Sequence, residues 1–314
     1  MAANVSALAD RLDADSLDGL TTSEAMGPWR LFWRRFRTNK IAVVGLVVLI
    51  LLILTAIFGP SLIATNPNKL DYAAINAKPS AVHPFGTDNL GRDTLARLVY
   101  GLRVSLTVAA YVTVLDLLLG VPLGLAAGYF GGKVDVAVTR VGDVLFAFPG
   151  LLLAILVAAI FGQAMTDRFG GIGRLMLVVG ALSLVSWPMM ARLVRSQTLT
   201  IRERDFITAA NAIGAGNTTI VRRHVFPQLL GLIVTTSTLG IAAVIVNEAV
   251  LSLLGLGIQP PDPSLGKMIT DAIPYLEMNG LQVLIPSATL VIIVLAVSFV
   301  GDGLRDAFDP GSIS

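Results

Sequence analysis

Two acidic side chains stand inside long apolar stretches, where a charge is costly. Asp116 follows the apolar run YVTVL, and Glu248 follows AAVIVN. A charged group at the centre of a membrane-spanning helix costs about 2.5–3.5 kcal/mol on insertion scales, so such a group is expected to face a partner or a water-filled path. The spacing of Gly120 and Gly124 after Asp116 indicates close approach of another helix, which favours a hydrogen-bonding role for this carboxyl over a place on a translocation path.

Glu248 shares one helical face with Ser252 and Gly255 and precedes a Gly- and Pro-rich loop, residues 255–266. Two interpretations remain open for it. The carboxyl can belong to a cavity or gate, or it can pair or protonate to hold two helices together.

The stretch HPFGTDNLGRD, residues 83–93, contains one histidine and two carboxylates, His83, Asp88 and Asp93. A single histidine with two carboxylates in a loop is a weak metal-ligand set. The proline and glycines between them favour turns, so we expect a turn-rich structural cap and no metal.

Several kinds of chemistry are excluded. The chain has no cysteine, which removes disulfides, thiolate metal sites and cysteine nucleophiles. Its two histidines, His83 and His224, fall on opposite sides of the expected membrane, so neither completes a Ser/His/Asp site, and His224 is expected to pack beside the following span. No phosphate-binding GxxxxGK(S/T) sequence occurs, so the chain is not expected to be an enzyme, and any ATP hydrolysis must occur in a partner.

The elements that carry these residues are membrane spans. Hydrophobic residues make up 54% of the 314 residues and charged residues 14%, against about 25% charged in a typical soluble domain. A net charge of +2 gives no footprint for nucleic acid. Apolar runs of bilayer length predict six transmembrane helices, at residues 41–58, 104–127, 144–161, 175–193, 229–256 and 281–300.

Lysine and arginine are concentrated in the loops that this count places inside, which predicts that both termini are cytoplasmic. Residues 1–28 are expected to be a disordered tail, residues 29–40 a basic segment on the inner leaflet, and residues 304–314 a cytoplasmic end. Residues 59–103 are expected outside and residues 104–303 to form the core. Three arginines crowd the outer end of the second span, which leaves a re-entrant or lateral helix open there: Arg92, Arg97 and Arg103.

A polar segment, residues 194–228, separates the fourth and fifth spans and is expected in the cytosol. Within it, an Asp start at Asp205, an alanine-rich run and a Gly stop at Gly214 predict a short helix. We expect one compact apolar face on this helix, suited to a tight groove, and a left-handed Gly214 at its end. The residues of that face are Phe206, Ala209, Ala210 and Ile213.

Three motifs carry a resemblance to a known family. Residues 187–227, WPMMARLVRSQTLTIRERDFITAANAIGAGNTTIVRRHVFP, resemble the cytoplasmic "EAA" loop of ABC-importer permeases, whose helix docks in a groove of the ATPase subunit. Residues 83–106 and 247–269 are similar to permeases for dipeptides, oligopeptides and nickel. The shorter C-type subunit is the nearest match, and the motifs cover most of the chain from Arg35 onward.

The resemblance implies an all-α membrane protein with the six-helix bundle of type I ABC importers. It implies a homologous permease as heterodimer partner, two ATPase subunits or one fused ATPase that bind Mg-ATP, an extracytoplasmic substrate-binding protein, and a multi-pass location in a bacterial inner or plasma membrane. No cofactor is implied for this chain. The implied coupling residues are Asp205, Phe206, Thr208, Ala209, Ala210, Ile213, Gly214 and Ala215, and the implied path or gate residues are Asp116, Asn247, Glu248 and Ser252.

One departure from the family pattern concerns the coupling helix. Thr208 stands where the family usually has Glu, and Asn211 replaces a basic residue, so docking by shape is retained without that glutamate's ion pair. The sequence thus predicts an ATP-driven importer subunit for peptides, with nickel or glutathione as alternative cargo. An ion-coupled transporter or channel, which would use Asp116 and Glu248, and a membrane-anchored scaffold or sensor are the competing classes; the cytosolic helix argues against the transporter or channel.

Overall fold

The computed structural model describes residues 28–63, 65–259 and 262–308, and within these ranges the regular secondary structure is helical. The predicted disordered tail lies outside the described residues apart from Pro28, as do residues 309–314. The helices, in chain order, are α2 (Pro28–Thr38), α3 (Lys40–Leu62), η1 (Tyr72–Ala74), α4 (Thr94–Phe130), α5 (Gly132–Phe146), α6 (Gly150–Arg202), α7 (Asp205–Ala212), α8 (Asn217–Ile220), the π-helical η2 (Val221–Val225), α9 (Phe226–Leu253), α10 (Leu265–Ala272), η3 (Ile273–Tyr275) and α11 (Leu281–Phe308).

Among the described residues, five continuous helices are long and apolar enough to cross a membrane: α3, α4, α6, the α8–α9 unit and α11. α6 is bent at Gly170, whose φ of 59° and ψ of −143° are not helical, so residues 150–169 and 171–202 form two arms. The third and fourth predicted spans fall mainly on these arms. The count of six and the cytoplasmic termini stay predictions.

Two boundaries differ from the sequence-based prediction. α4 begins at Thr94, ten residues before the predicted span at 104, because Asp93 caps it by accepting a hydrogen bond from the Ala96 N–H and because Arg97 is buried rather than solvated. Residues 94–103, expected in the outer segment or in a re-entrant or lateral helix, are therefore helical and continuous with the second span. The predicted span from residue 144 is also interrupted: α5 ends at Phe146, and α6 starts only after Pro149.

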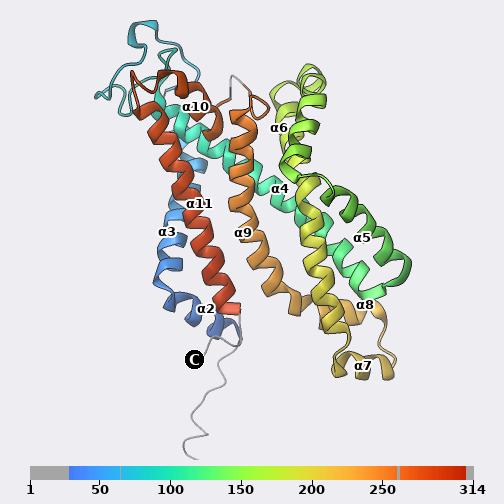
Figure 1. Cartoon of the computed structure of the whole chain (residues 1–314). Helices are drawn as coiled ribbons and strands as arrows, with labels where there is room; N and C mark the ends of the chain where they lie inside the picture. Colours follow the sequence, from blue (N-terminus) through green and yellow to red (C-terminus); the bar gives the residue numbers. More distant parts are fainter. Residues whose placement is uncertain (1–27, 64, 260–261, 309–314) are drawn as a thin grey trace, which may run out of the picture.

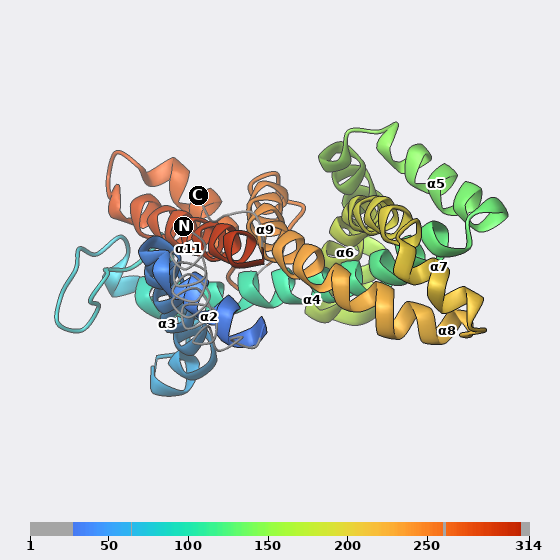
Figure 2. The same ribbon diagram turned by 90° about the horizontal axis from the view of Figure 1, so that it is seen from below.

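The helices are arranged along α4, which contacts helices at both ends of the bundle. In Figure 1, α3 and α11 lie side by side with α9 next to α11, while α5, α6 and α7 lie at the opposite end. Figure 2, seen from below, shows α4 running between these two groups, and α4 contacts α3, α6 and α9. Residues predicted to act in coupling thus lie at one end of the bundle, together with the C-terminal ends of α4 and α6.

A glycine ladder sets the distance between α4 and α6. A Cβ on Gly120 would lie 2.7 Å from the Met190 Cβ, and one on Gly124 would lie 2.4 Å from the Ala191 carbonyl oxygen. Gly128 is packed in the same way, against the Arg195 carbonyl. The close packing predicted at Gly120 and Gly124 is confirmed, and it continues at Gly128. It ends there, because Gly132 starts α5 with nothing within 4 Å of its added Cβ.

The basic N-terminal segment forms α2, as its amphipathic pattern predicts. Phe36 is buried and packs with Ala42 and Ala307, which anchors α2 on the ends of α3 and α11. Trp33 remains exposed, with the Arg37 guanidinium 5.1 Å from its ring centroid. Its position on the inner leaflet stays a prediction.

Candidate functional site

The predicted cytosolic helix is α7, and its C-terminal end follows the predicted pattern. Gly214 has a φ of 79° and donates to the Asn211 carbonyl at 3.0 Å, while the Ala215 N–H donates to the Ala210 carbonyl at 3.0 Å. These two bonds are the Schellman arrangement, which requires a left-handed residue at Gly214. At the other end the N-cap is Arg204, without a side-chain cap, so Asp205 is the first helical residue and not the cap.

The apolar residues of α7 divide between two faces, which corrects the prediction of one docking face. Ala210 is 7% exposed and, with Ile207 at 1%, packs into a core that includes Ile220 and Val225. The outward residues are Phe206, 39% exposed, Ala209, also exposed, and Ile213, 86% exposed. Ala210 is therefore part of this chain's own core, because residues three apart, 207 and 210, lie on the same side of a helix.

The segment after α7 fixes this helix against the membrane-spanning helices. The Tyr129 hydroxyl donates to Asn217 Oδ1 at 3.1 Å, joining the end of α4 to α8, and Arg204 donates to Gln228 Oε1 at 3.1 Å. The His224 ring centroid lies 6.3 Å from the Phe206 ring centroid, so His224 contacts α7. Its packing beside the following span stays a prediction. Thr208 and Asn211, at the two departures from the family pattern, are both exposed.

Asp116 on α4 has a hydrogen-bonding partner on α6. The Ser186 hydroxyl donates to Asp116 Oδ1 at 2.7 Å, and the carboxyl is half-buried. This contact lies beside the glycine ladder, so it supports the hydrogen-bonding role favoured by the sequence.

Glu248 on α9 is fully buried among hydroxyl groups. Its Oε1 accepts from Ser252 at 2.8 Å and its Oε2 accepts from Ser105 on α4 at 3.0 Å. Ser264, the N-cap of α10, lies 3.2 Å from the Ser252 hydroxyl. The cluster ties α4, α9 and α10 together, which agrees with the interpretation of Glu248 as a buried carboxyl that holds helices together. Asn247, beside it, is half-buried.

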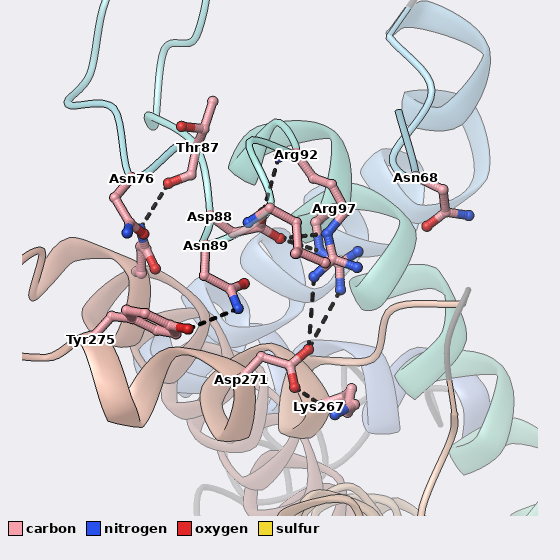
Figure 3. A network of polar contacts seen from close by, with 12 residues as sticks. Asn68, Asn76, Thr87, Asp88, Asn89, Arg92, Arg97, Lys267, Asp271 and Tyr275 are labelled. Atoms are coloured by element: carbon pink, nitrogen blue, oxygen red, sulfur yellow. Dashed lines mark hydrogen bonds and ion pairs between the residues drawn. The ribbon is translucent and has the colours of Figure 1, made fainter. Parts of the chain in front are cut away.

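Arg92 and Arg97, at the N-terminal end of α4, form a buried network with two aspartates (Figure 3), whereas Arg103 is exposed. Arg92 Nε lies 2.7 Å from Asp88 Oδ2, and Arg97 Nε lies 3.4 Å from the same oxygen. Both guanidinium groups also face Asp271 of α10, at 3.9 Å and 4.0 Å. The two guanidinium groups can be buried because Asp88 and, far along the chain, Asp271 supply opposite charges.

Each residue of the weak metal-ligand set is held by another side chain or by a helix cap. His83 Nδ1 lies 2.8 Å from Asp93 Oδ2, Asp93 Oδ1 caps α4, and Asp88 is held by the two arginines. Within the described part of the chain, no group of three potential ligands is close enough to hold a metal ion. Gly86 and Gly91 both have a φ of 74°, which confirms the predicted turns in this cap.

Sequence patterns did not predict that Arg174, just after the bend of α6, binds carbonyl groups beyond α9. Arg174 is 8% exposed, and its Nε donates to the Gly257 carbonyl at 2.9 Å while Nη2 donates to the Gly255 carbonyl at 3.3 Å. These carbonyls follow the end of α9, where a cation is favoured by the helix dipole. Gly162 leaves room for the guanidinium, since a Cβ there would lie 2.3 Å from Nη1.

Two ion pairs between α5 and α6 were also not predicted, because a sequence pattern does not show which residues of two helices face each other. Asp135 forms a bidentate pair with Arg195, with Nη2 2.7 Å from Oδ2. Hydrogen bonds from Arg195, opposed by partial desolvation, hold the pKa of Asp135 below its ordinary value of 3.8. Further along, Arg192 Nη2 lies 3.0 Å from Asp143 Oδ1.

Membrane-length helices, an anchored short helix and buried polar clusters between helices are typical of a membrane transport protein, and comparison with known families agrees. Residues 120–313 match the family described as binding-protein-dependent transport system inner membrane component, and residues 27–79 match the N-terminal TM domain of oligopeptide transport permease C. The chain belongs to the binding-protein-dependent permeases of ABC importers, as a C-type subunit, and is a multi-pass inner-membrane protein.

Curated relatives are similar over nearly their whole length. The chain is 39% identical over 286 residues to a dipeptide transport system permease protein DppC of Alkalihalophilus pseudofirmus, covering 91% of both chains. It is 40% identical over 284 residues to a glutathione transport system permease protein GsiD of Pectobacterium atrosepticum, covering 90% of this chain and 91% of the relative. It is 35% identical over 294 residues to an oligopeptide transport system permease protein OppC of Bacillus subtilis, covering 92% of both.

The fold also matches a solved ABC importer. A structure of the MetNI methionine ABC transporter in an inward-facing conformation aligns with a TM-score of 0.54 and 22% identity, covering 68% of this chain and 96% of that one. At this identity the match shows the fold alone, which is the type I importer permease fold.

Proposed function

We propose that this permease imports short peptides, dipeptides or oligopeptides, driven by ATP hydrolysis in separate subunits. The similarity to permeases named for dipeptides and oligopeptides supports this cargo. The relative named for glutathione is equally similar, and glutathione is itself a small peptide, so it is the second candidate cargo.

The ATPase-docking element is the outward face of α7. Phe206, Ala209 and Ile213 recur at the spacing of one helical face, and Ile213 is the most exposed of them at 86%. An exposed apolar face on a cytosolic helix whose other side is anchored is a surface made for a partner's groove. This observation carries the coupling proposal, with Thr208 contributing no charge to the contact.

The rest of the machine follows from this role. A homologous permease completes the path, two ATPase subunits or one fused ATPase supply Mg-ATP hydrolysis, and an extracytoplasmic binding protein delivers the peptide. No nucleotide or other cofactor is assigned to this chain. Asp116, Asn247, Glu248 and Ser252 act in helix packing near the path, in keeping with the contacts of Asp116 and Glu248.

The test is a substitution on the outward face. Ile213→Glu should leave insertion and thermal stability unchanged, because the side chain is exposed, but should reduce ATPase copurification and abolish uptake and stimulated ATP hydrolysis together. Val82→Glu is the matched control: Val82 is 78% exposed in the outer segment and should leave ATPase copurification intact. Copurification and stimulation equal to wild type in the Ile213→Glu complex would sink the docking assignment.

Cargo is tested in the same reconstituted complex. Binding protein loaded with a dipeptide should stimulate ATP hydrolysis and support uptake of labelled dipeptide. Stimulation by glutathione-loaded protein alone would replace the peptide assignment with the glutathione one.

A further inference from the structure

A crevice between α5 and the second arm of α6 has no role in the packing or coupling described above. It has a cavity volume of about 290 Å³, close to the lower end of the roughly 300–1,000 Å³ typical of small-ligand sites. α5 contributes Gly142, Asp143 and Phe146, and the facing stripe of α6 contributes Trp187 and Arg192. Figures 1 and 2 show α5 at the end of the molecule, beside α6.

The crevice combines apolar side chains with the charged pair of Arg192 and Asp143, and Arg195, which is paired with Asp135, also lines it. The Arg192 guanidinium lies 4.4 Å from the Phe146 ring centroid and donates to Asp143 Oδ1 at 3.0 Å. Both charged side chains are 54% exposed. Stacking on an aromatic ring and one carboxylate contact leave most of the five N–H donors of the guanidinium available.

This pair is not needed to join the two helices. Asp135 and Arg195 already do so with a bidentate contact, and their side chains are only 22% and 30% exposed. The Arg192–Asp143 pair lies one to two helical turns away, with a single hydrogen bond and much greater exposure. Charged groups along membrane-spanning helices face water-filled cavities or paths rather than lipid.

We infer that this crevice is a cargo subsite on the inner part of the translocation path, and that it takes a zwitterionic short peptide. Arg192 binds the peptide's α-carboxylate, Asp143 binds its ammonium group, and Phe146 and Trp187 contact an apolar or aromatic side chain. The inference rests on the proposed peptide function. It adds a recognition step by the permease itself, after release from the binding protein.

The chemistry of the lining is complementary to this ligand. A guanidinium and a carboxylate side by side match the two termini of a peptide, whereas an anionic lipid headgroup without an ammonium group leaves Asp143 unmatched. The stacked Arg192 is held in place before the ligand arrives, which lowers the cost of binding. Arg140, on α5, is exposed but does not line the crevice, and it supplies a matched control.

The experiment uses the nucleotide-free complex in nanodiscs without binding protein, so that specificity upstream does not interfere. The probe is the dipeptide alanyl-p-benzoyl-phenylalanine, and cross-linked peptides are located by mass spectrometry. We expect labelling within residues 138–146 or 187–195, competed by free alanyl-phenylalanine and poorly by its C-terminal amide. Arg192→Gln should lower labelling about three- to tenfold and remove the preference for the free acid, while Arg140→Gln should match wild type.

Each outcome decides the inference. Equal labelling in Arg192→Gln and wild type, no labelling of these segments, or protection by phospholipid but not by dipeptide overturns it. The proposed function is judged separately by peptide uptake: wild type that imports dipeptide but is not labelled in the crevice refutes only the subsite. Wild type that imports no peptide refutes the proposed function itself.

Discussion

Replacing Glu248 tests whether its hydroxyl cluster stabilises the outer half of the bundle. In Glu248→Leu, the hydroxyls of Ser105 and Ser252 lose acceptors at 3.0 Å and 2.8 Å in a fully buried site. A buried donor left unpaired costs about 1–3 kcal/mol, but helical serines can turn to the carbonyl four residues earlier, and hydrogen bonds between membrane helices average only about 0.6 kcal/mol. We therefore expect a net loss of about 1–3 kcal/mol for the two together.

The assay heats the purified complex to a series of temperatures and measures, by size-exclusion chromatography, how much intact complex remains. A loss of this size corresponds to a melting temperature about 3–8 °C lower. Glu248→Gln keeps the shape and one acceptor and should lose less than half as much. Glu277→Gln, at an exposed position in the outer loop, is the control and should melt like wild type.

A double variant separates the physical causes. If the unpaired serines are responsible, adding Ser105→Ala to Glu248→Leu should recover part of the loss, because one orphaned donor is removed. A Glu248→Leu protein that melts at or above the wild-type temperature would refute the reasoning: desolvation of the carboxyl would then outweigh its hydrogen bonds.

Three further predictions follow from contacts in the inner half. Ala210→Glu places a carboxylate in the core with Ile207, so it should lower expression and melting temperature by itself, unlike Ile213→Glu; equal stability of the two variants would contradict the two-faced α7. Gly124→Ala should destabilise by about 1–3 kcal/mol, since its Cβ would meet the Ala191 carbonyl at 2.4 Å, while Gly240→Ala, with nothing within 4 Å, should be neutral or stabilising in the same melting assay. Because the pKa of Asp135 is lowered in the folded protein, its contribution to the free energy of unfolding is present above its ordinary pKa of 3.8 and is lost as pH falls toward the lowered pKa. Asp135→Asn should therefore reduce the pH dependence of the melting temperature between about pH 5 and pH 3. An unchanged pH profile would show that the Arg195 pair is not responsible.

The sequence alone determined the features that depend on neighbouring residues. Apolar runs indicated where the membrane-length helices lie, although not their ends, because a helix must supply bilayer length from one continuous segment. Gly214 predicted where α7 ends, since a left-handed stop is a local property of the backbone. The motif around the same helix also indicated the permease family, which the relatives confirm.

Tertiary structure alone decided which partners distant residues find. Arg97 looked like an outer flank, yet it is buried inside α4 because Asp271, far along the chain, lies across from it. Ala210 was predicted to lie on the docking face, but the chain returns through α8 and η2 and covers it with Ile220 and Val225. Periodicity gives the spacing of side chains around one helix, whereas the rotation of that helix against its neighbours is set by packing, which no local pattern records.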